Sequence, residues 1–450
     1  MKRYLDAIPS ILFGAAFIMV FVLFGYVTRA TGAWPDRIIA QGWAAGQDLS
    51  AHFQGYIGLE PTRHIHVEPR YADGVSISDT DRMEPGVTFL TGFFDNDHAM
   101  LLVDHEGNEL HRWTVNLFET FPSLEHVQPA ESRPRDNWQT HLHGAYPLPD
   151  GSVVFNFDLH GLVRVDACGA PTWTLDRMAH HAISRGDDGT FWVPSRVHHL
   201  DEVDRLPMMQ PPFYEDQVLQ VSEDGEVLKT ISLPEVFYKN DMLGDLFANG
   251  VRIPTNADPD MLHTNDAQVL NADVASAFPM FETGDLAVSM RDLNLVMVID
   301  PDTGKVKWKQ TGPWLRQHDP DFLADGTISV FDNRSDGSLF GDVLGGSRIV
   351  KVNPETGQST VVFKRGKDQD QRRFYTHIMG KHQFLPNGNL LVTETIAGRV
   401  MEVTPNGDVV WQYVNRYDDE RTALITSALR YPQDHFEFLG TSCKTAGETS

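Results

Sequence analysis

The sequence predicts an all-β protein built as a six-bladed β-propeller, and three observations support that fold class. Beyond residue 87, short runs of β-branched and aromatic residues are separated by Gly, Asp, Asn and Pro, as is typical of successive strands and turns. A strand, a tight turn and a second strand recur six times along the chain. A second hairpin of the same kind precedes most of these copies.

The recurring unit contains a turn of the Asp-x-x-Gly or Pro-Asn-Gly kind, in which Gly, Asn and Asp tolerate positive φ. The six copies are VDHEGNELHRW (103–113), VDACGAPTW (165–173), VSEDGEVLKTI (221–231), IDPDTGKVKW (299–308), VNPETGQSTVV (352–362) and VTPNGDVVW (403–411). Loops of different length explain the unequal spacing of their turn glycines, which are Gly107, Gly169, Gly225, Gly304, Gly357 and Gly407.

The second hairpin recurs as HGAYPLPDGSVVFNF (143–157), HAISRGDDGTFWVPSR (181–196), HDPDFLADGTISVFDNR (318–334) and GKHQFLPNGNLLVTET (380–395). In the fourth unit its strands, LHTNDAQVL (262–270) and DLAVSMR (285–291), are separated by an insertion. Two hairpins make a four-stranded antiparallel sheet, and radial stacking of six sheets leaves few exposed edges. We expect the propeller to span residues 87–416, followed by a tail over 417–450. The alternative is an open array of sandwiched sheets.

Residues 1–30 are expected to form a membrane anchor, because residues 8–27 carry no charge and twenty apolar residues let a helix cross about 30 Å of hydrocarbon. Lys2 and Arg3 precede this segment and predict that the N-terminus stays inside. In a bacterium the bulk of the chain would then lie in the periplasm, held by a single pass in the inner (cytoplasmic) membrane. The alternative is a cleaved signal peptide. Residues 31–86 are expected to be a linker with a short helix.

The composition limits the partners that the protein can bind and the disulfide bonds that it can form. With 62 acidic and 37 basic residues the formal charge is −25, which repels phosphate backbones and argues against nucleic-acid binding. Cys168 and Cys443 are the only cysteines, so a disulfide framework is excluded. One bond between them and two unpaired thiols both remain open.

Histidines recur at one register of the predicted innermost strands, which line the channel of a propeller. His143, His181 and His318 each stand eight positions before the turn glycine of their hairpin, and His263 heads the corresponding strand of the fourth unit. In the sixth unit the register falls on Gly380, with Lys381 and His382 beside it. We therefore expect the imidazoles to converge at one channel mouth. Packing roles are the alternative for individual histidines.

Two chemistries use such a ring of imidazoles: metal binding and the binding of an oxyanion. Asn265 lies two residues after His263, on the same strand face, and Arg291 closes the next strand of that unit. A guanidinium is repelled by a metal ion but matches a tetrahedral oxyanion. Binding of an oxyanion is therefore the favoured interpretation. Arg196, Arg316 and Arg334 compete with Arg291 for this role.

At these residues the sequence resembles the bacterial arylsulfate sulfotransferases, which are periplasmic six-bladed propellers that move a sulfuryl group between phenols through a transient sulfohistidine. The resemblance covers roughly residues 88–415. It is carried by HTN (263–265), SMRDLNLVMVIDPDTGKVKW (289–308), QHDPDFLADGTISVFDN (317–333) and FLPNGNLLVTETIAGRVMEVTPNGDVVW (384–411).

The resemblance implies that His318 is the nucleophile, Arg291 the sulfate-binding arginine and His263 with Asn265 the His-x-Asn pair of the family. His181 matches the remaining histidine, with His180 as its alternative. We accordingly expect catalytic roles for His318, His263, Arg291 and His181. Substrate-binding roles are expected for Asn265, His180, His143 and Arg334. No metal or other cofactor is expected.

The implied reaction is PAPS-independent sulfuryl transfer from an aryl sulfate donor to a phenolic acceptor with ping-pong kinetics. Asp319 and Asp321 place negative charge beside His318, where an anionic donor has to approach. Two other functions stay open. One is a non-catalytic membrane-tethered propeller that docks a partner protein, and the other is a histidine-metal oxygenase or hydrolase.

Overall fold

The computed structural model describes residues 19–20, 22–27, 46, 54–55, 59–68, 70–248, 260–364 and 374–440. The chain divides into two compact units, one made of residues 1–62 and 250–258 and the other of residues 63–249 and 259–450. Every strand that the structure describes belongs to the second unit.

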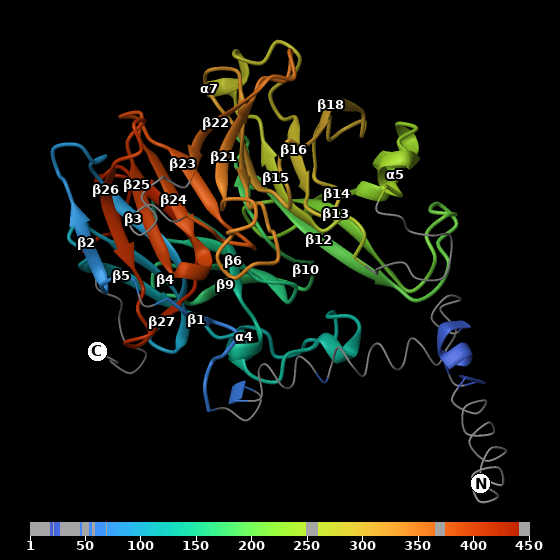
Figure 1. Cartoon of the computed structure of the whole chain (residues 1–450), viewed down its shortest axis with the longest axis horizontal. Helices are drawn as coiled ribbons and strands as arrows, with labels where there is room; N and C mark the ends of the chain where they lie inside the picture. Colours follow the sequence, from blue (N-terminus) through green and yellow to red (C-terminus); the bar gives the residue numbers. More distant parts are fainter. Residues whose placement is uncertain are drawn as a thin grey trace, which may run out of the picture. The chain divides into compact units, whose positions relative to one another are not determined.

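Six antiparallel sheets of four or five strands make up the second unit, and they confirm the six-bladed propeller (Figure 1). Blade one is β28 (Ile425–Tyr431), β3 (Val87–Phe94), β4 (Asp97–Val103) and β5 (Glu109–Thr114). Blade two is β6 (Leu142–Pro147), β7 (Val153–Phe157), β8 (Gly161–Val165) and β9 (Pro171–Leu175). Blade three is β10 (Met178–Ala179) and β11 (Ser184–Arg185), both on β12 (Phe191–His199), then β13 (Phe213–Val221) and β14 (Val227–Ser232).

The remaining blades follow the same order. Blade four is β15 (Thr264–Val269), β16 (Leu286–Met290), β17 (Leu295–Ile299) and β18 (Val306–Thr311). Blade five is β19 (His318–Phe322), β20 (Ile328–Asp332), β21 (Arg348–Val352) and β22 (Ser359–Lys364). Blade six is β23 (Lys381–Phe384), β24 (Leu390–Glu394), β25 (Arg399–Val403), β26 (Val409–Val414) and β2 (Gly74–Ser78).

Short helices lie in the loops between strands. They are α4 (Leu117–Thr120), α5 (Leu233–Lys239), α6 (Leu243–Leu246) and α7 (Ala272–Ala275), the last within the insertion predicted for blade four. Three 3-10 turns cover Ala130–Ser132, Asn137–Gln139 and Thr395–Ala397. The turn glycines adopt the expected conformation, as Gly326 with φ of 76° shows between β19 and β20.

Both ends of the propeller differ from the expected boundaries. The segment expected as a tail contains β28, which pairs with β3 and supplies the innermost strand of blade one. The expected linker contributes β2, which covers the outer strand β26, and β1 (Ile65–Val67), which pairs with β27 (Arg421–Ala423). The reason is that an unpaired strand edge invites non-native pairing, and the C-terminal strand removes it at the point where the ring closes.

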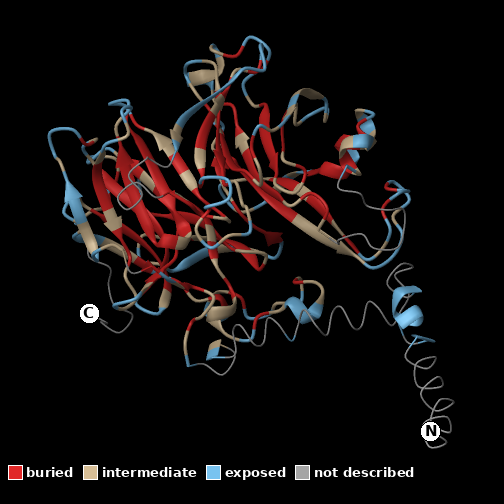
Figure 2. Cartoon of the chain, in the orientation of Figure 1, coloured by how far each residue is buried: buried red, intermediate tan, exposed pale blue. Residues whose placement is uncertain are grey.

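Among the described residues, hydrophobic clusters join blades one and two, two and three, four and five, five and six, and six and one. The buried strands occupy the inner part of the sheets (Figure 2). Phe89, Trp113 and Phe155 pack blade one on blade two. Val296 and Val330 belong to the cluster that joins blades four and five. Packing between blades holds the sheets in place, which fixes the positions of the side chains that the innermost strands direct into the channel.

Among the described residues, no helix is long and apolar enough to cross a membrane. Within the segment expected as the anchor, residues 19–20 and 22–27 are helical and exposed, and the rest lies outside the described residues. Cys168 is disulfide-bonded. Its only possible partner in the sequence, Cys443, also lies outside the described residues.

Closure of the ring depends on Gly92 of β3. A Cβ atom at this position would meet the carbonyl oxygen of Leu424 at 2.3 Å, just before β28 begins. We expect Gly92→Ala to lower the free energy of unfolding by about 1–3 kcal/mol, because the backbone of the closing strand has to move. The measurement is urea unfolding, with Gly244→Ala as control because nothing lies within 4 Å of a Cβ there. Equal stability of the two variants would contradict this account of closure.

Candidate functional site

Four imidazoles converge at the beginnings of the innermost strands, as predicted. His143 lies in β6, His181 between β10 and β11, His263 directly before β15, and His318 opens β19. The ring centroid of His181 is 4.0 Å from that of His143, 5.2 Å from that of His263 and 6.1 Å from that of His318. Blades two to five therefore contribute one imidazole each to a single cluster.

Irregular backbone directs these side chains. The pairing register shifts at Leu142/Ala145 in blade two, at Thr264/Asp266 in blade four and at His318/Asp321 in blade five. His181 and His263 have positive φ values of 59° and 50°. Bulges and left-handed residues re-aim side chains, and they concentrate at functional sites.

The closest approach is between blades two and three. Gly144 has no room for a Cβ atom, which would lie 2.0 Å from the carbonyl oxygen of His181. That oxygen accepts a hydrogen bond of 2.7 Å from Nδ2 of Asn156, a residue of β7. Glycine at 144 thus lets the His143 and His181 rings meet.

The side-chain amide of Asn333 fixes the orientation of the His318 ring. Its Nδ1 lies 2.7 Å from Oδ1 of Asn333, whose Nδ2 donates to the carbonyl oxygens of Thr376 and Met379 at 3.0 and 2.7 Å. Because both amide hydrogens are used, Oδ1 has to accept, so Nδ1 of His318 carries the hydrogen. The lone pair is then on Nε2, which has no hydrogen-bond partner among the described residues.

The surroundings keep His318 neutral. Burial lowers its pKa well below the ordinary value, and the positive charge of Arg291 lowers it further. The hydrogen bond to Asn333 opposes this shift without outweighing it. A neutral imidazole with a free Nε2 is a nucleophile at physiological pH.

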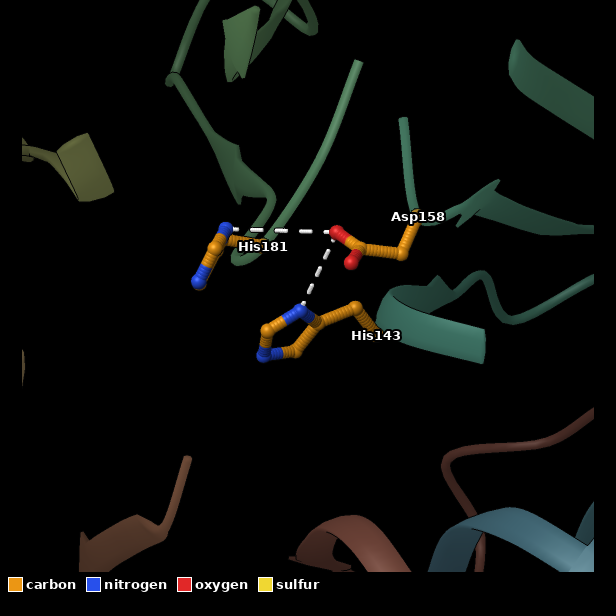
Figure 3. Close-up of side chains that lie close together, drawn as sticks. All are labelled: His143, Asp158 and His181. Carbon is orange, nitrogen blue, oxygen red and sulfur yellow. Dashed lines mark hydrogen bonds and ion pairs between the residues drawn. The ribbon is translucent and has the colours of Figure 1, made fainter. Parts of the chain in front are cut away.

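His143 faces a carboxylate (Figure 3). Its Nδ1 lies 3.3 Å from Oδ1 of Asp158, and Nδ1 of His181 lies 4.0 Å from the same oxygen. Burial raises the pKa of Asp158, but His143 outweighs burial and holds that pKa well below the ordinary range. Asp158 is therefore ionised and stabilises positive charge on the neighbouring rings.

His263 also faces a carboxylate. Its Nδ1 lies 2.7 Å from Oδ2 of Asp260, which Arg196 approaches to 3.6 Å. Burial opposes ionisation, yet the hydrogen bond with His263 and the charge of Arg196 lower the pKa of Asp260 to about 2. Asp260 is therefore ionised, and its carboxylate accepts the hydrogen at Nδ1 of His263.

His180 lies behind His181. The Nδ1 atoms of the two rings are 2.8 Å apart, so one nitrogen donates and the other accepts. Burial lowers the pKa of His180 to about 3, and that of His181 falls well below the ordinary value for the same reason. His180 thus contacts the four-histidine cluster through His181.

Asn265 and Arg291 lie next to these rings. Asn265 donates from Nδ2 to the carbonyl oxygen of Gln317 at 2.6 Å, and its buried Oδ1 has no hydrogen-bond partner among the described residues. Arg291 donates from Nε to Asp292 at 2.8 Å, and no described residue engages its Nη groups. Nη2 of Arg316 forms an ion pair with Oδ1 of Asp292 at 3.1 Å.

Arg334 does not join the cluster. Its backbone N–H donates to the carbonyl oxygen of Leu315 at 3.0 Å, and its charge acts on Asp332. No contact in the described part of the chain links its side chain to the four histidines. The substrate-binding role expected for Arg334 has no support in this geometry.

Asp319 does not present its charge to the histidines. Its φ of 54° turns the side chain toward blade six, where it contacts Nζ of Lys381 and accepts the backbone N–H of His382 at 2.6 Å. Burial raises the pKa of Asp319, but Lys381 and His382 outweigh burial and keep the carboxyl ionised. Its negative charge is therefore compensated within the channel.

The model of the arylsulfotransferase (ASST) family matches residues 144–416, which is more than half of the chain. The chain belongs to the arylsulfotransferase family. Within this match lie His181, His263, Asn265, Arg291 and His318, and His143 stands one residue before it. No curated protein matches the chain.

Solved structures resemble this family member only distantly. A protein of unknown function from Bacteroides caccae is 13% identical, with a TM-score of 0.46 over 76% of this chain and 98% of that one. A streptogramin B lyase is 12% identical, with a TM-score of 0.39 over 80% and 90%. The virginiamycin B lyase of Staphylococcus aureus is 12% identical, with a TM-score of 0.34 over 62% and 71%. At these values no property of those proteins is transferred to this chain.

Sequence reasoning missed the residues that hold the imidazoles of this arylsulfotransferase-family chain. Asp158 and Asn333 each stand seven positions after the turn glycine of their hairpin. The register count that located the histidines would have located these residues if it had been extended into the second strand. Asp260 carries no such signal, because it lies in a loop that is peculiar to blade four.

The Asn333 contact generates a prediction about the protonation of His318. Replacing the amide by a carboxylate in Asn333→Asp stabilises the imidazolium ion, so the pKa of His318 rises from its value well below 6.5. Nitrogen-15 NMR of histidine-labelled protein measures this pKa and the tautomer. Asn353→Asp, in a turn at the far end of blade five, is the control and leaves the titration unchanged. An unshifted pKa in Asn333→Asp would contradict the assigned contact.

Proposed function

We propose that the protein transfers a sulfuryl group from an aryl sulfate ester to a phenolic acceptor, without PAPS, through a sulfohistidine formed at Nε2 of His318. The observation that carries the proposal is the hydrogen bond from Nδ1 of His318 to Asn333, which leaves a neutral ring with its lone pair on Nε2. Membership of the arylsulfotransferase family supports the reaction class.

In the first half-reaction, Nε2 of His318 attacks sulfur in line and the bond from sulfur to the phenolic oxygen breaks. Negative charge then grows on the leaving oxygen and remains on the three sulfuryl oxygens. The free Nη groups of Arg291 are suited to receiving those oxygens as a fork of donors. His181 and His143 supply further ring nitrogens around the same point.

The leaving phenolate needs a proton, and His263 is the proposed general acid. The carboxylate of Asp260 stabilises the protonated ring, so Nε2 of His263 can donate as the bond to sulfur breaks. His318 has an amide partner and His263 a carboxylate partner, and this difference supports placing the nucleophile and the acid on different rings.

The second half-reaction reverses the first. An acceptor phenol enters after the donor phenol has left, and His263 takes the proton from its hydroxyl group. The phenolic oxygen attacks the sulfur on His318, which regains its Nε2 lone pair. The kinetics are accordingly ping-pong.

The nucleophile is tested with 4-nitrophenyl sulfate as donor and phenol as acceptor. His318→Asn removes the attacking nitrogen, so 4-nitrophenolate release falls to background and intact-mass analysis shows no sulfuryl adduct. His111→Asn, in the outer strand β5, is the control and retains both signals. Retained transfer in His318→Asn would refute the proposal.

The general acid is tested by the choice of leaving group. In His263→Gln, transfer from phenyl sulfate slows by about 10²-fold or more, because a poor leaving group needs the proton. Transfer from 4-nitrophenyl sulfate slows much less, because 4-nitrophenolate leaves without protonation. Steady-state rates with both donors give the comparison. An equal loss with the two donors would exclude His263 as the acid.

The proposed location is the extracytoplasmic side of the membrane, with residues 8–27 as a single-pass anchor. The disulfide of Cys168 supports this side, because disulfides persist in oxidising compartments. The apolar length of the segment supports the anchor. A reporter enzyme that is active only outside the cytoplasm, fused behind the propeller, should be active. An inactive but folded fusion would reverse the topology.

A metal-dependent reaction at His143, Asp158 and His181 is the second candidate, because their possible ligand atoms all lie within 4.8 Å of one another (Figure 3). Imidazole and carboxylate ligands of this kind suit zinc or iron. Elemental analysis of the purified protein separates the candidates. One equivalent of transition metal that disappears in Asp158→Asn, together with no sulfuryl transfer by the wild type, would favour the metal enzyme.

A further inference from the structure

A second polar cluster lies in the channel next to the histidines. It consists of Asp266 of β15, Asp319 and Asp321 of β19, and Lys381 and His382 of β23. All five residues line a cavity of about 330 Å³ that His143 and His318 also border. The innermost strands of blades four, five and six thus meet around these charges.

Three members of the cluster offer closely spaced ligand atoms. Nδ1 of His382 is 2.7 Å from Oδ2 of Asp319, and Nε2 of His382 is 3.8 Å from Oδ2 of Asp321. Possible ligand atoms of Asp319, Asp321 and His382 all lie within 4.8 Å of one another. That spacing is compatible with one ion between them at ordinary metal–ligand distances of about 2.0–2.6 Å.

Asp266 is the independent indication of a ligand. Asp266 is only 2% exposed and lines the cavity, and its Oδ1 has no hydrogen-bond partner in the described part of the chain. A buried carboxylate oxygen without a donor is costly, so such atoms are usually paired or bound to a metal. No described protein atom donates to Oδ1 of Asp266, and a bound cation would supply the missing partner.

The charges in the channel also indicate a bound cation. Three carboxyl groups face one ammonium group, that of Lys381, so full ionisation of the carboxyl groups would leave an excess of two negative charges when His382 is neutral. Arg185 also lines the cavity, but it pairs with Glu223. One divalent cation would neutralise the excess.

We propose that Asp266, Asp319, Asp321 and His382 form a binding site for a divalent metal cation of the Mn²⁺ or Ca²⁺ kind. Three carboxylates and one imidazole are a hard, oxygen-rich donor set, which suits these ions better than softer metals. Lys381 holds one oxygen of Asp319 and leaves the other directed toward His382.

The cation has a positioning role for the neighbouring site. Asp266 directly follows Asn265, and Asp319 directly follows His318. Metal binding would tie β15, β19 and β23 together immediately behind these residues. The site does not take part in the transfer chemistry, so the proposal does not rest on the proposed function.

The test uses the full chain after removal of metals with EDTA and dialysis. Isothermal titration with Mn²⁺ and with Ca²⁺ should give one site, and the bound ion should raise the melting temperature. Asp321→Asn should weaken binding by at least about tenfold. Asp325→Asn is the matched control, because this carboxylate lies in the turn after β19 and pairs with Lys351.

A wild-type measurement covers the case in which Asp321→Asn fails to fold. Electron spin echo modulation of bound Mn²⁺ should show coupling to a single imidazole nitrogen, that of His382. Coupling to two imidazoles would place the ion at His143 and His181 and overturn the proposal. The absence of Mn²⁺ and Ca²⁺ binding would also overturn it, since protons would then neutralise the cluster.

Discussion

The hydrogen bond at Nδ1 of each channel histidine is the constraint on which the site depends. It fixes the ring orientation and the position of the ring hydrogen, and so determines what Nε2 can do. The partner differs from ring to ring: an amide for His318, carboxylates for His143 and His263, and a second imidazole for His181. Four copies of one residue type thereby acquire different chemistry.

In blades two and five the propeller supplies these partners because the innermost hairpin carries a pair of positions. The first strand directs the histidine into the channel, and the residue after the second strand lies behind it, as His318 and Asn333 illustrate. Inter-blade packing keeps neighbouring hairpins in place. Closure of the ring by β28 then joins the last blade to the first.

The repeated features were predictable from the sequence, and the features that occur once were not. Six turn glycines and a recurring histidine register revealed the blades and the cluster. The strand β28 carries no turn motif, so its place in blade one followed only from the structure. The left-handed conformation of Asp319 was equally hidden, because sequence adjacency to His318 suggested that its charge faced the donor. Single-residue backbone reversals of this kind leave no periodic signal.

The charged and titratable residues of the channel form two groups. The histidines with Asp158, Asp260 and Arg291 form one group, and Asp266, Asp319, Asp321 and Lys381 form the other. In the second group Asp319 pairs with Lys381, which compensates its charge beside the histidine cluster. An anionic donor can therefore be accommodated in a chain that carries a net charge of −25.

The stereochemical course at sulfur tests the central claim most directly. A donor aryl sulfate made chiral with three oxygen isotopes is incubated with phenol, and the configuration of the product is determined. Two in-line displacements through sulfohistidine at His318 predict retention of configuration. Inversion would mean a single direct transfer between phenols and would contradict the account.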